Sequence, residues 1–122
     1  MASVLLVDDD VGWLWALGPV VAAAGYVVRT ATNGLDAMRL AREYPPDVVV
    51  TDLAMPVMGG VDLIRALRAD PALSCVPVIL MSESRKRPRL RIVCFIHKPF
   101  PAATLLRQLR RLRGRALRSL PM

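Results

Sequence analysis

Five side chains that could bind a metal ion or take part in group transfer follow short apolar runs of the sequence. They are Asp8, Asp9, Asp52, Ser82 and Lys98. The two neighbouring aspartates come after the run at residues 4–7, and Asp52 comes after the run at 48–51. The serine and the lysine follow two later runs, at 76–81 and 92–96. A fold that brought the ends of these runs together would gather three carboxylates, a hydroxyl and an ammonium group.

Such a set suits phosphoryl transfer to a carboxylate. Three carboxylates held close together repel one another, and burial makes full ionisation more costly. A hard divalent cation relieves this repulsion, and Mg²⁺ commonly bridges one or two carboxylates to a phosphate while keeping several waters. The Ser82 hydroxyl can donate to a phosphoryl oxygen, and Lys98 adds a flexible positive charge. The metal and the lysine would neutralise charge while an aspartate attacks phosphorus in line.

Apolar runs alternate with helical patterns along the chain. The runs at 4–7, 26–28, 48–51, 76–81 and 92–96 are rich in β-branched residues, which is typical of strands covered on both faces. Helical spacing recurs between them, and a first helix containing Trp13, Leu17 and Val21 should end at Gly25. This alternation predicts an α/β fold with a doubly wound, five-stranded parallel sheet. Ligands of such sheets bind outside the carboxyl ends of the strands, where all five side chains should meet.

Other polar or small residues near the predicted site have simpler explanations. We interpret Asp10 as the N-cap of the first helix rather than a ligand. The turn after Met58 is enough to explain Gly59 and Gly60, with no contact to phosphate. His97 is the only histidine, and it is expected to be solvated because the sequence shows no partner for it.

Four stretches of the chain, in order, resemble the receiver domains of bacterial response regulators. They are residues 4–10 (VLLVDDD), 51–60 (TDLAMPVMGG), 76–82 (VPVILMS) and 95–100 (FIHKPF). The resemblance implies a single receiver domain over residues 1–122, with the flavodoxin-like strand order 2-1-3-4-5. It also implies a cytoplasmic phosphoprotein of two-component signalling, with slow self-catalysed dephosphorylation, rather than an enzyme in the usual sense. The donor would be a histidine kinase or a histidine phosphotransfer protein, and the output would be altered binding to an unidentified protein.

The resemblance also implies a phosphoacceptor and a metal site. Asp52 would accept the phosphoryl group. Asp9, Asp52 and the backbone carbonyl of Ala54 would bind Mg²⁺ directly, whereas Asp8 would act mainly through bound water.

Three further positions match the family's conserved machinery by resemblance. Ser82 and Phe95 fall on the hydroxyl and aromatic switch positions, although Phe95 could equally be only a core residue. Lys98 falls on the family's invariant lysine, and its peptide bond to Pro99 should be cis. The cis form has a low energetic cost only when the following residue is proline.

The connection between the fourth and fifth predicted strands departs from the family's pattern. Only nine residues separate Ser82 from Ile92, whereas a helical crossover needs a dozen or more, and Pro88 limits a helix further. We expect the family's fourth helix to be shortened to one turn or absent, leaving an irregular basic loop. The surface that this helix, the fifth strand and the fifth helix provide for output and dimerisation in the family must then differ.

Glu83 and Trp15 also depart from the family's pattern. A small residue is usual at the position of Glu83, whose carboxylate would slow phosphorylation unless it turns outward or pairs with an arginine. Trp15 stands where polar groups are usual. It predicts either an exposed apolar patch for a partner or a homodimer, or a helix rearranged at Pro19 that buries one tryptophan.

Positive charge gathers in the C-terminal third of the chain. All ten acidic residues lie between Asp8 and Glu83, whereas residues 85–118 contain ten arginines and two lysines. Such a region could attract nucleic acid, an anionic membrane or an acidic protein, although an arginine-rich composition alone could produce it. No aromatic interleaving or recognition helix supports nucleic-acid binding. No apolar run approaches the roughly 20 residues of a membrane span. We therefore expect neither nucleic acid nor a membrane as a partner.

Two other functions fit part of the pattern. A degenerate pseudo-receiver would keep the pocket but bind its partner independently of phosphorylation, as the short crossover and Glu83 suggest. Asp8 and Asp10, two residues apart after the first strand, also resemble the motif of haloacid-dehalogenase-like phosphatases. Gly12 stands where that family has threonine or valine, and the chain lacks room for a cap domain, so this hypothesis is weak.

Overall fold

Strands and helices alternate along the chain in the computed structural model, which describes residues 2–118, with side chains to residue 114. The strands are β1 (Ser3–Val7), β2 (Val27–Ala31), β3 (Val48–Asp52), β4 (Val78–Ser82) and β5 (Cys94–His97). The helices are α1 (Val11–Ala23), α2 (Gly34–Glu43), α3 (Gly60–Ala69) and α4 (Ala102–Arg118). All strand pairs are parallel, in the order β2-β1-β3-β4-β5. The predicted α/β fold and strand order are confirmed.

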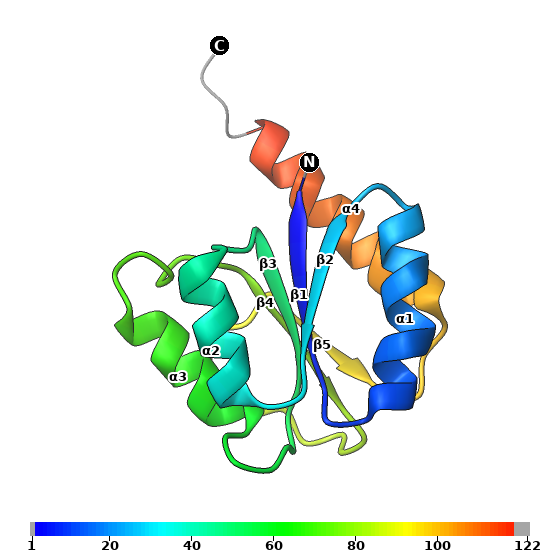
Figure 1. Cartoon of the computed structure of the whole chain (residues 1–122). Helices are drawn as coiled ribbons and strands as arrows, with labels where there is room; N and C mark the ends of the chain where they lie inside the picture. The colour runs from blue at the N-terminus through cyan, green and yellow to red at the C-terminus, as the bar shows by residue number, and fades with distance from the viewer. Residues whose placement is uncertain (1, 119–122) are drawn as a thin grey trace.

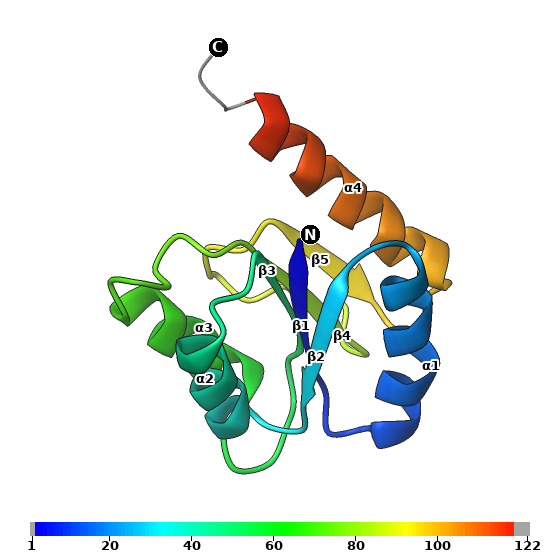
Figure 2. The ribbon, with the colours of Figure 1, turned by 45° about the horizontal axis from the view of Figure 1, so that its top comes forward.

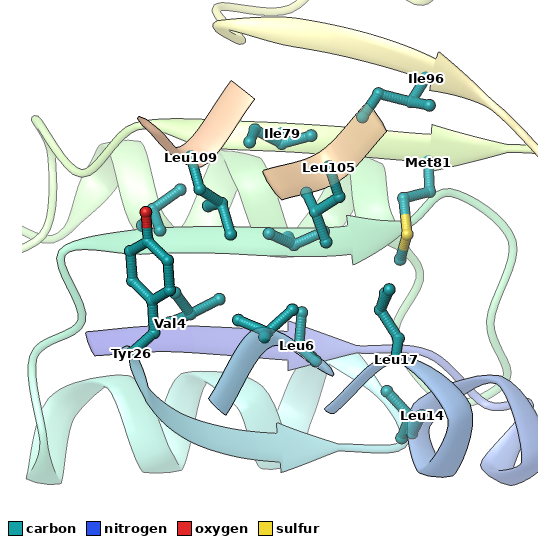
Figure 3. Close-up of a cluster of buried hydrophobic side chains, with 13 residues drawn as sticks. Val4, Leu6, Leu14, Leu17, Tyr26, Ile79, Met81, Ile96, Leu105 and Leu109 are labelled. Atoms are coloured by element: carbon teal, nitrogen blue, oxygen red, sulfur yellow. The ribbon is translucent and has the colours of Figure 1, made fainter. Parts of the chain in front are cut away.

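The sheet is covered on both faces. Figure 1 shows α1 and α4 on one side and α2 and α3 on the other, and Figure 2 shows the same layers turned toward the viewer. Every residue of β3 and β4 is buried, which explains their uninterrupted apolar sequence. Figure 3 shows the layer under α1 and α4, where Leu6, Ile79 and Ile96 of the sheet meet Leu17 and Leu105. These packed layers fix the strands, and hence the edge at which the strands end.

No helix connects β4 to β5. Residues 83–93 are all described and form no helix, which agrees with the expectation that the family's fourth helix is shortened to one turn or absent. The fifth strand begins at Cys94, slightly later than the position near Ile92 that the sequence indicated. Leu90 and Ile92 of this connection pack against the apolar cluster under α2 and α3. They cover apolar surface there in the absence of a helix.

Arg68 of α3 holds the connection in place. Its guanidinium donates hydrogen bonds to the backbone carbonyls of Val76, at 2.6 Å, and Arg91, at 2.8 Å. Arg91 in turn donates to the carbonyl of Ser74 at 2.6 Å. Two arginines therefore join α3, the segment before β4 and the irregular connection, a network that the sequence analysis did not predict.

Helix α1 begins and ends as predicted. The Asp10 side chain accepts a hydrogen bond from the Trp13 amide at 3.1 Å, which makes Asp10 the N-cap. Gly25, with a φ of 101°, follows the C-cap. The helix continues through Pro19, and Trp15 is 78% exposed, whereas Trp13 packs partly inside. Trp15 is therefore exposed, as the first alternative expected, and the helix is not interrupted at Pro19.

Among the described residues, no helix has the length and apolar character needed to cross a membrane.

Candidate functional site

The five predicted side chains lie at one edge of the sheet, which is the lower edge in Figure 1. Asp8 directly follows β1, Asp52 ends β3, Ser82 ends β4 and Lys98 directly follows β5. Together with Asp9 they line one cleft of about 530 Å³. Residues far apart in sequence meet here because parallel strands all end at the same edge.

Three carboxylates converge in the cleft. Asp8 is fully buried, Asp52 is 8% exposed and Asp9 is exposed. One oxygen atom from each lies within 4.8 Å of the others. Ala54, whose carbonyl the resemblance places on the metal, lines the same cleft. A set of hard oxygen donors open to water on one side fits the requirements of Mg²⁺.

The Lys98 ammonium lies between two of these carboxylates and an aromatic ring. Lys98 is 7% exposed, and its Nζ donates to Asp8 Oδ2 at 2.7 Å and lies 3.5 Å from Asp52 Oδ1. The ring of Trp13 lies 5.0 Å from the same nitrogen, and it stacks on Phe100 with ring centroids 5.0 Å apart. The Lys98–Pro99 bond is cis, as predicted. The sequence placed Trp13 only in the apolar pattern of the first helix and did not predict its contact with Lys98.

Burial and charge shift the protonation of two of these groups. Burial, followed by the negative charge of Asp8, raises the pKa of Asp52 to about 6, although Lys98 opposes the rise. Burial lowers the pKa of Lys98, but its hydrogen bond to Asp8 and the charges of both aspartates outweigh this effect and raise the pKa. Near neutral pH, Lys98 is therefore a cation and Asp52 a carboxylate that ionises at some cost.

Comparison with known proteins agrees with this geometry. The model of the response regulator receiver domain matches residues 4–110 of the chain. The chain belongs to the response regulator receiver family. This receiver is 34% identical over 115 residues to the transcriptional regulatory protein KdpE of Mycobacterium tuberculosis, which covers 90% of the chain and 50% of KdpE. It is 38% identical over 82 residues to Protein PilH of Pseudomonas aeruginosa, covering 67% of the chain and 68% of PilH. The receiver thus spans about half the length of KdpE.

Solved structures agree with the fold. The chemotaxis response regulator CheY4 of Vibrio cholerae superposes with a TM-score of 0.85 at 30% identity, covering 92% of this chain and 98% of CheY4. The receiver domain of the sensor histidine kinase PA1611 of Pseudomonas aeruginosa superposes with a TM-score of 0.86 at 26% identity, covering 93% and 98% of the two chains. That structure has a magnesium ion coordinated in its active site cleft.

The end of β3 is held in place by close backbone contact with Gly60, the first residue of α3. The amide of Gly60 donates to the Leu53 carbonyl at 2.8 Å, and a Cβ at Gly60 would lie only 2.4 Å from the Asp52 carbonyl oxygen. Only glycine, which lacks a Cβ, lets the backbone at residue 60 come this close to the end of β3. From the sequence alone, Gly60 was explained only by the turn after Met58. Val57, in the loop between β3 and α3, has a φ of 67°, which is strained for a β-branched residue.

Ser82 and Phe95, the two residues that the resemblance places at switch positions, occupy different surroundings. Ser82 is buried at the cleft, and its Oγ accepts a hydrogen bond from the Ser84 amide at 3.0 Å. Phe95 is half-buried and packs against the apolar cluster under α2 and α3. Its position is compatible with a switch role and equally with a core role.

Glu83 and His97 lie beside each other at the rim. The Glu83 side chain is exposed and lines the cleft. His97 is half-buried, with Nε2 located 2.8 Å from the Glu83 carbonyl oxygen, to which a protonated Nε2 donates. His97, which was expected to be a solvated strand-end residue without a partner, does end β5, but it is half-buried and has a partner. Its partner is a backbone carbonyl from a neighbouring strand end, which the side-chain pattern of a sequence does not indicate.

Proposed function

We propose that this receiver, taken as one domain over residues 1–122, accepts a phosphoryl group on Asp52 from a phosphohistidine donor. Mg²⁺ would be held by Asp9, Asp52 and the Ala54 carbonyl, with Asp8 acting mainly through bound water. The observation that carries the proposal is the position of the Asp52 carboxylate, close to two other carboxylates and 3.5 Å from a buried ammonium. The Asp52 carboxylate thus lies beside oxygen atoms that could bind a metal ion and beside the Lys98 ammonium, which could pair with the transferred phosphoryl group.

The transfer replaces one bond to phosphorus with another. An Asp52 oxygen attacks phosphorus in line, the bond to the donor's imidazole nitrogen breaks with its electron pair going to nitrogen, and an acyl phosphate forms. Bound Mg²⁺ would supply positive charge to the phosphoryl oxygens. With a pKa of about 6, Asp52 is ionised at neutral pH, as a nucleophile must be. Lys98 can pair with a phosphoryl oxygen, and Ser82 has its hydroxyl proton free to donate because its Oγ is an acceptor for Ser84.

The output would be a change in protein binding. Formation of a hydrogen bond from Ser82 to the phosphoryl group would favour one of two conformations, and Phe95 would follow into the space that is vacated. The same cleft would hydrolyse the acyl phosphate slowly. We infer that the donor is a histidine kinase or a histidine phosphotransfer protein and that the partner is a downstream protein or, through the exposed face of α1, a second copy.

A pseudo-receiver that binds its partner without phosphorylation is the second candidate. Two observations support it: the helix missing from residues 83–93 and the Glu83 carboxylate at the rim of the cleft. In this case the cleft would keep its structure but would not be modified.

Chemical phosphorylation separates these candidates. The full chain is incubated with acetyl phosphate and MgCl2, and the modified residue is located by mass spectrometry after borohydride reduction. We expect labelling of Asp52 that is lost with EDTA and in Asp52→Asn, and kept in Asp62→Asn, which alters an exposed aspartate of α3. Failure of the magnesium-loaded wild type to label, with correct folding by circular dichroism, would favour the pseudo-receiver.

A further inference from the structure

A second concave surface lies between β5, α4 and the irregular connection. We call it the basic groove, and its volume is about 270 Å³. It is lined by Arg87, Val93, Cys94, Phe95, Gln108, Arg111 and Leu112. The irregular connection forms one wall of this surface, because Arg87 and Val93 belong to the segment that stands in place of the family's fourth helix.

Positive charge surrounds the basic groove. Arg87 lines the groove from the connection and Arg111 lines it from α4, with Cys94 of β5 in the same lining. Further exposed cations lie on the same two segments: Arg85, Lys86, Arg89, Arg91, Arg107 and Arg110. The sequence contains no acidic residue after Glu83 to balance them. A ligand of this groove should therefore be anionic.

The groove follows an open sheet edge. Within the described residues β5 pairs only with β4, so its other side presents unpaired backbone groups. Open edges invite another strand, and charge at an edge opposes pairing between identical copies. Two copies of this chain would bring like-charged arginines together, whereas an acidic strand would be attracted.

We propose that the basic groove binds an acidic, extended segment of a partner protein, which adds to β5 as a further strand. Backbone groups of the segment would pair with β5, carboxylates would pair with Arg87 and Arg111, and apolar side chains would contact Val93 and Leu112. A nucleic acid would share only the charge complementarity, because its sugars and phosphates cannot continue the sheet. The proposal concerns a surface separate from the acidic cleft and does not depend on phosphorylation of Asp52.

Fluorescence anisotropy with a short, fluorescein-labelled peptide of glutamate and valine tests the charge requirement on the unphosphorylated full chain. We expect Arg87→Glu combined with Arg111→Glu to weaken binding by about tenfold or more, as for loss of two favourable ion pairs. The matched control is Arg39→Glu combined with Arg65→Glu, which makes the same change in net charge on exposed positions of α2 and α3. Equal weakening by the two double variants would overturn the proposal, since binding would then depend on net charge alone.

Two further measurements test strand addition and the class of partner. A peptide of the same sequence with alternate backbone nitrogens methylated keeps its carboxylates but loses donors, so it should bind several-fold more weakly than the parent. NMR shift changes on peptide addition should centre on residues 93–97. Equal affinity of the methylated peptide, or shifts centred elsewhere, would overturn strand addition. Tighter, competing binding of a single-stranded oligothymidylate or of vesicles containing phosphatidylserine would overturn the acidic-protein assignment.

Discussion

Replacement of Asp52 by asparagine should stabilise the metal-free protein, by an amount that depends on pH. The Asp52 carboxyl has a folded-state pKa of about 6 against an ordinary value of 3.8, because it is buried and lies near Asp8. A proton therefore binds more tightly to the folded protein than to the unfolded chain. The stabilisation by that proton is fully present below the unfolded pKa, and it is lost as the pH rises through 6.

The size of the effect follows from the same shift. Each pKa unit corresponds to about 1.36 kcal/mol, so the ionised carboxylate costs the fold about 3 kcal/mol at pH 7.5. Linkage gives a cost of only about 1 kcal/mol at pH 4.5, where the folded protein keeps its proton. Asparagine has nearly the same shape and never ionises. Asp52→Asn should therefore gain stability over the wild type by these two amounts at the two pH values.

Urea unfolding in EDTA at both pH values measures this difference. Asp62→Asn is the control, because it alters an exposed carboxylate on α3, and its effect should stay within about 0.5 kcal/mol. Addition of Mg²⁺ should raise the stability of the wild type more than that of Asp52→Asn, since a ligand that binds the folded state stabilises by mass action. An Asp52→Asn gain that is the same at pH 4.5 and pH 7.5 would refute the explanation by burial and charge.

Three further predictions concern the backbone and the rim of the cleft, the first with Gly18→Ala as its control. Gly60→Ala should destabilise by about 1–3 kcal/mol in urea unfolding, because its Cβ would overlap the Asp52 carbonyl; Gly18→Ala, where the added methyl meets no atom within 4 Å, should instead stabilise by up to about 1 kcal/mol. Val57→Asn should raise stability by about 1 kcal/mol, since asparagine tolerates a positive φ better than valine, and no change in the urea midpoint would argue against strain there. Glu83→Ala should label faster with acetyl phosphate than the wild type, because a carboxylate at the rim repels the incoming phosphoryl group; equal rates would remove this hypothesis.

The convergence of the cleft could be predicted from sequence because it depends on strand ends. Once parallel strands are inferred, Asp8, Asp52, Ser82 and Lys98 must meet at one edge, whatever the details of the loops. The N-cap role of Asp10 was predictable for a similar reason, since capping depends on the residue type at one local position.

Contacts made by long side chains could not be predicted in the same way. Arg65 and Arg68 stand on the same helix and look alike in sequence, yet Arg65 is exposed beside Asp62 whereas Arg68 donates to three backbone carbonyls. The carbonyls that Arg68 reaches belong to segments without regular structure, and no sequence pattern marks them. The contact of Trp13 with Lys98 is similar, because apolar periodicity places the indole toward the core but does not indicate a cation across its face.

The short connection alters one side of the molecule and leaves the cleft intact, for a physical reason. Ser82 and Lys98 are fixed by β4 and β5 themselves, whose ends are joined by the hydrogen bond from the Lys98 amide to the Ser82 carbonyl at 2.8 Å. Loss of a helix between the two strands therefore need not move either side chain. Phe95, however, lines the basic groove, and it is also the residue that the resemblance places at the aromatic switch position. If phosphorylation of Asp52 moves Phe95, the same movement changes the wall of the groove, so acyl phosphate formation should alter the affinity for an acidic strand.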